Sequence, residues 1–153
     1  MTAAPIPSRA TTEQVAAFIA SEFPQTRCLV RRVGEGEAVV AHPVGVDELR
    51  PGGTVSGPVM MAVADVALYA AILGAIGIVP LAVTTSLTIN FLRRPTADRD
   101  IVATCKLLKL GRSLAVGEVC LRSEGQDEPV AHAVGTYSIP PDTARPTDAT
   151  TLS

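Results

Sequence analysis

The sequence contains no tryptophan, only two histidines and three cysteines, and aromatic residues make up 3% of its 153 residues. Lys and Arg number 13 against 15 Asp and Glu. With no basic excess to hold a phosphate backbone and few aromatic rings to stack on bases, nucleic-acid binding is not expected. The cysteines, Cys28, Cys105 and Cys120, are widely spaced and odd in number, which favours reduced thiols in a cytoplasm over a disulfide framework.

Other absences narrow the class further. No CxxC motif or histidine cluster accompanies the cysteines, so neither a metal site nor a cofactor is expected. Residues 1–10 have no apolar core preceded by positive charge, so a cleaved signal peptide is not expected and a cytoplasmic location is. Hydrophobic residues make up 47% and charged residues 18%, which favours one folded domain. We expect this domain over residues 11–140, with flexible tails at 1–10 and 141–153.

The longest apolar run extends from Val59 to Val83 and contains one charged residue, Asp65. Its length would allow a membrane-spanning helix. That alternative is disfavoured, because an Asp near the centre of a span costs roughly 2.5–3.5 kcal/mol and no basic cluster or aromatic belt flanks the run. A helix that is apolar on every side is also typical of the buried centre of a soluble fold, where many Ala and Gly residues let a sheet pack closely. We therefore expect no membrane segment.

The helix predicted from this run begins at Ser56 or Gly57, either of which suits an N-cap, and ends near residues 74–77. Pro58 suits its first turn, because a missing N–H has no intrahelical partner to lose there. Asp65 then has two interpretations: a buried carboxylate held by a structural partner, or a functional group. The apolar surroundings favour the second.

The rest of the chain predicts an antiparallel sheet. Before the long helix we expect a short helix over residues 13–23, a hairpin of strands 28–33 and 37–42, and a Pro- and Gly-rich loop over 42–54. After it, alternation predicts strands at 83–92, 100–110, 113–122 and 128–139. Short connections make neighbouring strands antiparallel, so we expect these four to form a meander. The predicted class is α+β, an antiparallel sheet wrapped around one long buried helix.

Four segments follow one another in an order and spacing that carry a resemblance. They are Gly53-Thr-Val-Ser-Gly-Pro58 with Asp65-Val-Ala67, the strand 85–95, the turn Gly111-Arg112-Ser113, and the strand Val130-Ala-His-Ala-Val-Gly-Thr136. Together they resemble the hotdog-fold thioesterases of the PaaI-like (phenylacetic acid degradation) type, over roughly residues 44–139. The resemblance implies a hotdog fold, an acyl-CoA substrate, no metal, and a site between the protomers of a homodimer or homotetramer.

The resemblance also implies two catalytic residues. In that family a carboxylate on the central helix, eight residues after an oxyanion-binding glycine, drives thioester hydrolysis, and Asp65 stands eight residues after Gly57. A backbone N–H at a helix N-terminus is a preorganised donor for an oxygen that becomes negative. The carboxylate can either attack the carbonyl or deprotonate a water. Asp65 and Gly57 are therefore the predicted catalytic groups.

Two positions depart from the family pattern. Relatives often carry His-Gly-Gly where this chain has Ser56-Gly57-Pro58, so Gly57 must donate alone, because Pro58 has no N–H. Relatives often carry Asn or Gln where this chain has Arg50, which either polarises the substrate carbonyl or pairs with Asp65 and weakens it. These departures support a second hypothesis, a non-catalytic acyl-CoA or lipid-binding hotdog module.

The remaining candidates are substrate-binding residues, each with a simpler alternative. Guanidinium groups bind phosphate well, so coenzyme A phosphates are assigned to the group Arg93, Arg94, Arg112 and Ser113, which would otherwise be solvated strand ends. Asn90 and Tyr69 either line the acyl pocket or are half-buried polar groups. Tyr69 lies one turn after Asp65, within reach of a hydrogen bond to it. Ser56 either contacts the substrate or only caps the helix.

Overall fold

The apolar run forms helix α2, Gly57–Ile76, in a computed structural model that describes residues 5–141. Ser56 caps it, accepting a hydrogen bond from the Val59 N–H at 3.4 Å. Gly77 ends it with φ 91°, a left-handed conformation that favours glycine. The helix is long and apolar enough to cross a membrane, but 67% of its apolar window is buried inside the protein. Its predicted bounds and its buried position are confirmed.

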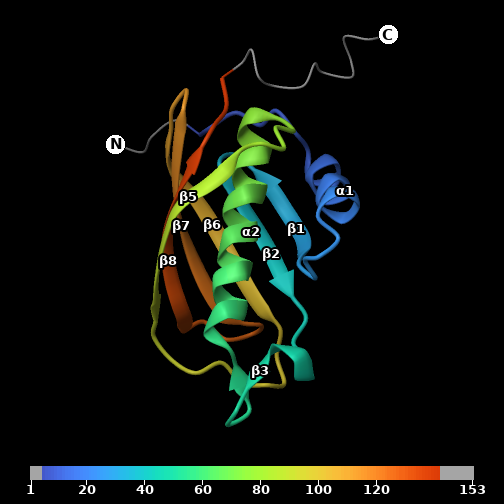
Figure 1. Ribbon diagram of the computed structural model, residues 1–153, viewed down its shortest axis with the longest axis vertical. Coiled ribbons are helices and arrows are strands. Elements are labelled where there is room, and N and C mark those ends of the chain that lie inside the picture. The colour runs from blue at the N-terminus through green and yellow to red at the C-terminus, as the bar shows by residue number, and fades with distance from the viewer. Residues whose placement is uncertain (1–4, 142–153) are drawn as a thin grey trace.

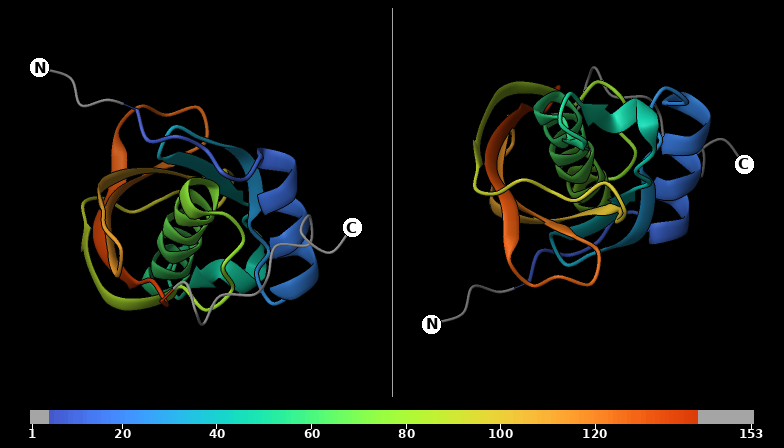
Figure 2. Two further views of the ribbon diagram at one scale, coloured as in Figure 1. Left: turned by 90° about the horizontal axis from the view of Figure 1, so that it is seen from above. Right: turned by 90° about the horizontal axis from the view of Figure 1, so that it is seen from below.

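Six strands form one antiparallel sheet around α2 in the order β1-β2-β6-β7-β8-β5 (Figure 1). Their bounds are β1 Leu29–Gly34, β2 Glu37–His42, β5 Val83–Phe91, β6 Ile101–Leu110, β7 Leu114–Ser123 and β8 Pro129–Ser138. Helix α1, Thr12–Glu22, packs against β1 and is capped by Thr11 in a capping box with Gln14. Seen from either end, the sheet curves around α2 while α1 lies on the outside (Figure 2). The α+β hotdog arrangement predicted from the sequence is confirmed.

The predicted four-strand meander is wrong in one connection. Strands β6, β7 and β8 pair in chain order, but β5 pairs with β8 at the far edge of the sheet. Residues 92–100 carry the chain from β5 to β6, which lies between β2 and β7. Alternation along a strand specifies its faces but not its neighbour, so the pattern of β5 does not encode this placement. The fold leaves most residues of β5 exposed along a free edge.

Close packing of the sheet on α2 depends on glycines. Gly117 of β7 lies opposite Gly135 of β8, and the fully buried Leu68 of α2 packs over both. A Cβ at Gly117 would lie 2.7 Å from Leu68 Cδ2, and a Cβ at Gly135 would approach Leu68 Cδ1 still more closely. Within α2, a Cβ at Gly74 would collide with Val33 of β1. Small residues therefore let the sheet approach the helix; this was predicted for the helix, as at Gly74, but not for the two sheet glycines.

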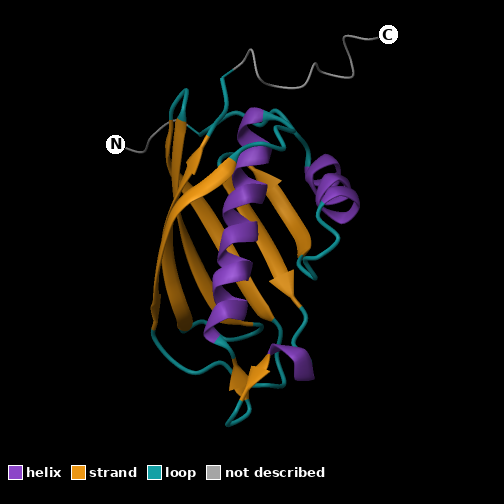
Figure 3. Cartoon of the chain, viewed as in Figure 1, coloured by secondary structure: helices purple, strands orange, loops and turns teal. Residues whose placement is uncertain are grey.

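The predicted loop before α2 contains short regular elements. They are the 3₁₀ turn η1, Val46–Glu48, and a small hairpin of β3, Leu49–Arg50, and β4, Thr54–Val55. Gly52 and Gly53 form its turn with φ 100° and 77°. The hairpin lies at the N-terminal end of α2 (Figure 3). Two-residue strands are too short to show alternation, so the sequence pattern did not predict them.

The N-terminal segment, predicted as a flexible tail, packs on the fold from Ile6 onward. The backbone N–H groups of Arg9 and Ala10 donate to the Gly74 carbonyl at 2.7 and 3.1 Å, Ala10 is buried and Ile6 packs against the core. These contacts correct the prediction for residues 6–10. The predicted tails at 1–4 and 142–153 lie outside the described residues.

Candidate functional site

Asp65 lies half-buried on the side of α2 that faces β5 and β8, rather than fully buried. The Thr84 hydroxyl of β5 donates to Asp65 Oδ1 at 2.6 Å, and the Tyr137 hydroxyl of β8 donates to the same oxygen at 2.7 Å. The Tyr137 hydroxyl also lies 3.1 Å from the Asp65 carbonyl oxygen. Within residues 5–141, no group donates to Asp65 Oδ2. The carboxylate is therefore held through Oδ1, and Oδ2 is left without a donor from the described residues.

Tyr137 is suited to remain a donor to this carboxylate. Burial and the negative charge of Asp65 raise the pKa of the Tyr137 hydroxyl well above its ordinary value. The phenol therefore keeps its proton at neutral pH and holds Asp65 as the acceptor. Thr84 and Tyr137 were missed in the sequence, because they are 19 and 72 positions from Asp65 in the chain and only the folded sheet brings them together.

Two contacts that the sequence left open for Asp65 do not form within the chain. The Tyr69 hydroxyl donates to the Pro80 carbonyl at 3.0 Å, not to Asp65. Arg50 lies on β3 at the N-terminal end of α2 and forms no ion pair with Asp65. Spacing along the helix allowed the first contact, but the chain that returns after α2 offers Tyr69 a backbone acceptor instead.

Asp65 opens into a cavity of about 690 Å³ between α1, α2 and β5, called here the aromatic cavity because four aromatic residues line it. The Tyr69 ring lies 6.1 Å from the Tyr137 ring and 6.3 Å from the Phe18 ring, measured between centroids. The residues that line this cavity are Phe18, Ser21, Glu22, Phe23, Asp65, Val66, Tyr69, Pro80, Ala82, Val83, Thr84 and Tyr137. This lining can enclose an apolar group beside the carboxylate.

Gly57 lies in a second cavity, of about 520 Å³, that gathers three of the predicted arginines. Its lining residues are Arg50, Thr54, Val55, Gly57, Met60, Phe91, Leu92, Arg93, Arg94 and Pro95. Arg93 forms an ion pair with Glu128 at 2.7 Å. The Phe91 ring of β5 lies against Gly57, where an added Cβ would be 3.2 Å from Phe91 Cζ. Ser56, just before this cavity, serves as the helix cap.

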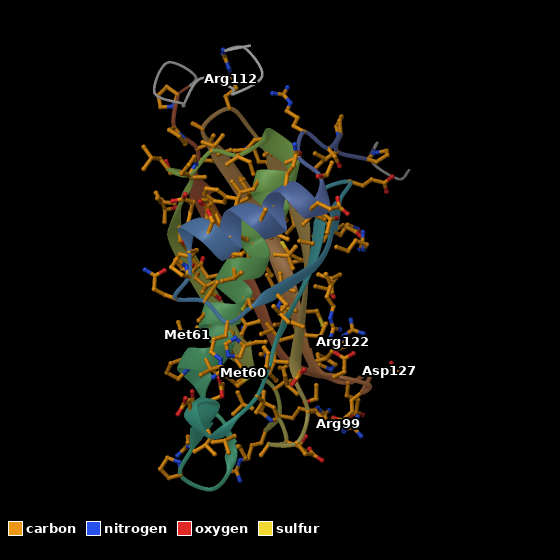
Figure 4. The ribbon with its side chains drawn as sticks, turned by 90° about the vertical axis from the view of Figure 1, so that its right-hand side faces the viewer. Met60, Met61, Arg99, Arg112, Arg122 and Asp127 are labelled. Carbon is orange, nitrogen blue, oxygen red and sulfur yellow. The ribbon has the colours of Figure 1, made fainter. Side chains whose placement is uncertain are left out.

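The other predicted residues lie elsewhere. Arg112 and Ser113 line a cavity of about 680 Å³ with Arg9 at the C-terminal end of α2. Arg112 is at the end of the molecule opposite Met60 and Met61, which mark the first turns of α2 (Figure 4). Asn90 is exposed on β5 and lines neither the Asp65 nor the Gly57 cavity. Across residues 5–141, no three His, Cys, Asp or Glu side chains form a metal-binding group.

One chain cannot bring its own Gly57 and Asp65 to a single thioester. Eight residues of α-helix span about 12 Å along the helix axis at 1.5 Å per residue. An oxyanion donor has to lie within about 3 Å of the carbonyl oxygen, and the attacking group within about 3–3.5 Å of the neighbouring carbon. If both groups act on one thioester, they therefore have to come from two different chains.

Comparison with known proteins gives the family. The family model of the thioesterase superfamily matches residues 52–130, which include Gly57, Asp65, β5, β6 and β7. The chain belongs to the thioesterase superfamily. It is thus a thioester hydrolase by family, and the predicted PaaI-like hotdog relationship is confirmed. No curated protein sequence matches the chain.

Solved structures of this superfamily agree. A candidate thioesterase from Silicibacter sp. TM1040 is 42% identical with a TM-score of 0.82, over 90% of this chain and 96% of that one. A mutant of the phenylacetic acid degradation protein PaaI from Thermus thermophilus is 30% identical with a TM-score of 0.68, over 78% of this chain and 98% of that one. The PaaI protein of Escherichia coli, 20% identical with a TM-score of 0.72 over 86% and 96%, shares the fold.

Proposed function

We propose that this thioester hydrolase is an acyl-CoA thioesterase whose sites are each shared by two copies of the chain. The Gly57 N–H of one protomer binds the thioester oxygen, and Asp65 of the partner subunit acts on the thioester carbon. The observation that supports this proposal is the exposed edge strand β5, which runs beside both groups. Phe91 near one end of β5 lies against Gly57, and Thr84 near the other end binds Asp65.

Pairing of β5 with its copy would bring the two groups together. An antiparallel pair centred between Leu87 and Thr88 sets position 84 of one strand opposite position 91 of the other. Gly57 of one protomer would then face Asp65 of the partner subunit, and the two-fold symmetry would give the dimer two such sites. The edge offers unpaired backbone groups and apolar side chains, since Val83 is 51% and Phe91 50% exposed.

We assign the two ends of the substrate to the two cavities. The cavity at Gly57 carries Arg50 and Arg94 besides the ion-paired Arg93, and these cations suit the phosphates of coenzyme A. The aromatic cavity at Asp65 suits the acyl group. The thioester lies where the cavities of two protomers meet, and Arg50 beside Gly57 adds positive charge near the carbonyl oxygen.

The chemistry follows from the positions of these groups. Asp65 Oδ2 either adds to the thioester carbon or removes a proton from a water that adds to it. The carbonyl oxygen becomes negative and accepts a hydrogen bond from the Gly57 N–H, aided by the positive end of the α2 dipole. The carbon–sulfur bond then breaks and coenzyme A leaves as a thiolate that takes up a proton. In the first route water finally hydrolyses the acyl–Asp65 anhydride, so both routes yield a carboxylic acid and a free thiol.

The test is hydrolysis of a panel of short-chain, medium-chain and aromatic acyl-CoAs, followed by thiol release. We expect turnover by the wild-type protein and a loss of kcat of about 10²–10⁴-fold in Asp65→Asn, the usual contribution of an acid–base group. Asp98→Asn removes an exposed carboxylate between β5 and β6 and is the matched control. Saturable acyl-CoA binding without turnover would instead select the non-catalytic binding module, and unchanged turnover in Asp65→Asn would exclude the proposed role.

A further inference from the structure

Glu48 is the one charged residue in the described part of the chain that is buried, with 3% of its surface exposed. It ends the turn η1 and lies outside the cavities that hold Gly57 and Asp65. A buried carboxylate is costly unless charged and hydrogen-bonded groups surround it. The proposed reaction gives Glu48 no part, so its surroundings need another explanation.

Three groups from different segments bind the Glu48 carboxylate. Arg27, just before β1, donates to Oε1 at 2.6 Å, and His42 at the end of β2 has Nε2 3.2 Å from the same oxygen. The Gly45 N–H donates to Oε2 at 2.7 Å. Burial opposes the charge, but the Gly45 N–H, His42 and Arg27 outweigh it and lower the pKa of Glu48. The carboxylate is therefore ionised at neutral pH and tied to the sheet.

The Cys28 thiol touches this cluster without forming a second reactive centre. Its Sγ lies 3.5 Å from Nδ1 of His42, which places cysteine, histidine and glutamate in a row. Burial raises the pKa of Cys28, so the thiol keeps its proton, and it lines none of the cavities described above. The cluster thus links the turn η1 to β2 and to the segment before β1, and it is not a nucleophilic centre.

The backbone of Glu48 leads directly to the oxyanion donor. Its carbonyl accepts a hydrogen bond from the Ser56 N–H at 2.9 Å, and Ser56 is the residue before Gly57. Its own N–H donates to the Gly45 carbonyl at 3.1 Å, so side chain and main chain both close the turn. The pairing of Leu49 with Val55 continues this link into the β3–β4 hairpin.

We propose that Glu48 is a positioning residue for the oxyanion donor: its anchored carboxylate fixes the carbonyl that holds Ser56, and through Ser56 the direction of the Gly57 N–H. This inference rests on the proposed thioesterase function. A misplacement of about 1 Å can cost about 10²-fold in rate, because the donor has to meet an oxygen whose charge develops only in the transition state. Loosening this anchor therefore lowers kcat more than it raises KM.

The experiment compares full-length variants with the best acyl-CoA of the panel. Glu48→Gln keeps the shape but loses the charge that binds Arg27, and we expect kcat to fall about 10- to 100-fold with KM within about twofold. Glu48→Asp keeps the charge and recovers part of the loss. Glu37→Gln is the control, because it removes an ion-paired carboxylate of β2, 3.1 Å from Arg32, at the opposite end of that strand. It should leave kcat unchanged.

A second variant covers the case in which Glu48→Gln does not fold. Arg27→Met removes the charged partner from the half-exposed side, and we expect a smaller fall in kcat, again at nearly constant KM. Either pattern supports positioning. The positioning role is overturned if the folded Glu48→Gln and Arg27→Met proteins both have the kcat of Glu37→Gln, whether their KM is unchanged or raised. That outcome would leave the proposed thioesterase function standing. If Asp65→Asn keeps full activity, the proposed catalytic site fails first.

Discussion

Removing the Gly57 N–H without disturbing the helix gives a sharp test of the shared site. Proline lacks the N–H and is favoured at the first position of a helix, where Gly57 stands. The preceding residue, Ser56, already has φ −72° and ψ 151°, the extended conformation that a following proline requires. Gly57→Pro therefore deletes the donor at little structural cost. Gly57→Ala adds a similar Cβ beside Phe91 but keeps the N–H, so it is the matched control.

The expected losses of turnover distinguish a site shared between two chains from a site within one chain. Loss of one oxyanion donor costs about 10²–10³-fold in kcat, and loss of the Asp65 carboxylate about 10²–10⁴-fold. Pure Gly57→Pro and pure Asp65→Asn proteins therefore keep at most about 1% of wild-type turnover. In a mixed pair, the Asp65→Asn chain supplies an intact Gly57 to the intact Asp65 of the other chain. One of its two sites is whole, so the mixed pair should show about half of wild-type turnover.

The assay uses two affinity tags. The two variants are co-expressed with different tags, mixed pairs are isolated by sequential purification, and thiol release is measured with one acyl-CoA. A gain of about fifty-fold over either parent is the expected result. Mixed pairs no more active than their parents would refute the shared site, and with it the inference from the 12 Å helical spacing.

Three further predictions concern single substitutions. Tyr137→Phe removes one of the two donors to Asp65 Oδ1 and should lower kcat about tenfold, because a hydrogen bond to a charged group is worth about 1.5–3 kcal/mol; steady-state kinetics at equal folding, judged by circular dichroism, checks this. Gly117→Ala places a Cβ 2.7 Å from Leu68 Cδ2 and should lower the free energy of unfolding by about 1–3 kcal/mol in urea titrations, and an unchanged midpoint would contradict this packing. Folding lowers the pKa of Glu48 below its ordinary 4.5, so the ionised carboxylate stabilises the folded protein above pH 4.5. This contribution is lost as the pH falls through the pKa that Glu48 has in the folded protein. The free energy of unfolding of Glu48→Gln should therefore fall less steeply with acid than that of the wild type.

The sequence predicted the elements that have a strong local pattern. The apolar run with Ser56 before it and Gly77 after it predicted α2, and alternation predicted the long strands, each within a few residues of its observed bounds. The edge position of β5 could not be predicted this way. Its partner is chosen by how the sheet closes around α2, and alternation is the same for every partner.

For the candidate site, the sequence offered only a spacing along one helix and a family resemblance. The eight-residue interval from Gly57 to Asp65 is local, and the family model spans both residues. The hydrogen bonds that orient Asp65 come from Thr84 and Tyr137, whose contacts form only across the folded sheet. Nothing in the sequence distinguished Glu48 from any other charged loop residue, because its neighbours in the chain do not indicate burial. Both are long-range features that a periodicity argument does not reach.

The packing of Leu68 over paired glycines also fixes α2 along its own length. Gly57 and Asp65 are carried by the same rigid helix, so a slip along the axis displaces both by the same amount. In the proposed two-fold pair the two α2 helices run antiparallel, so the two chains would slip in opposite directions. The offset between the Gly57 N–H and the Asp65 carboxylate of the partner subunit would then be twice the slip. If the proposed shared sites are correct, the position of α2 along its axis affects the reaction rate, and crowding at Gly117 or Gly135 would misalign both sites at once.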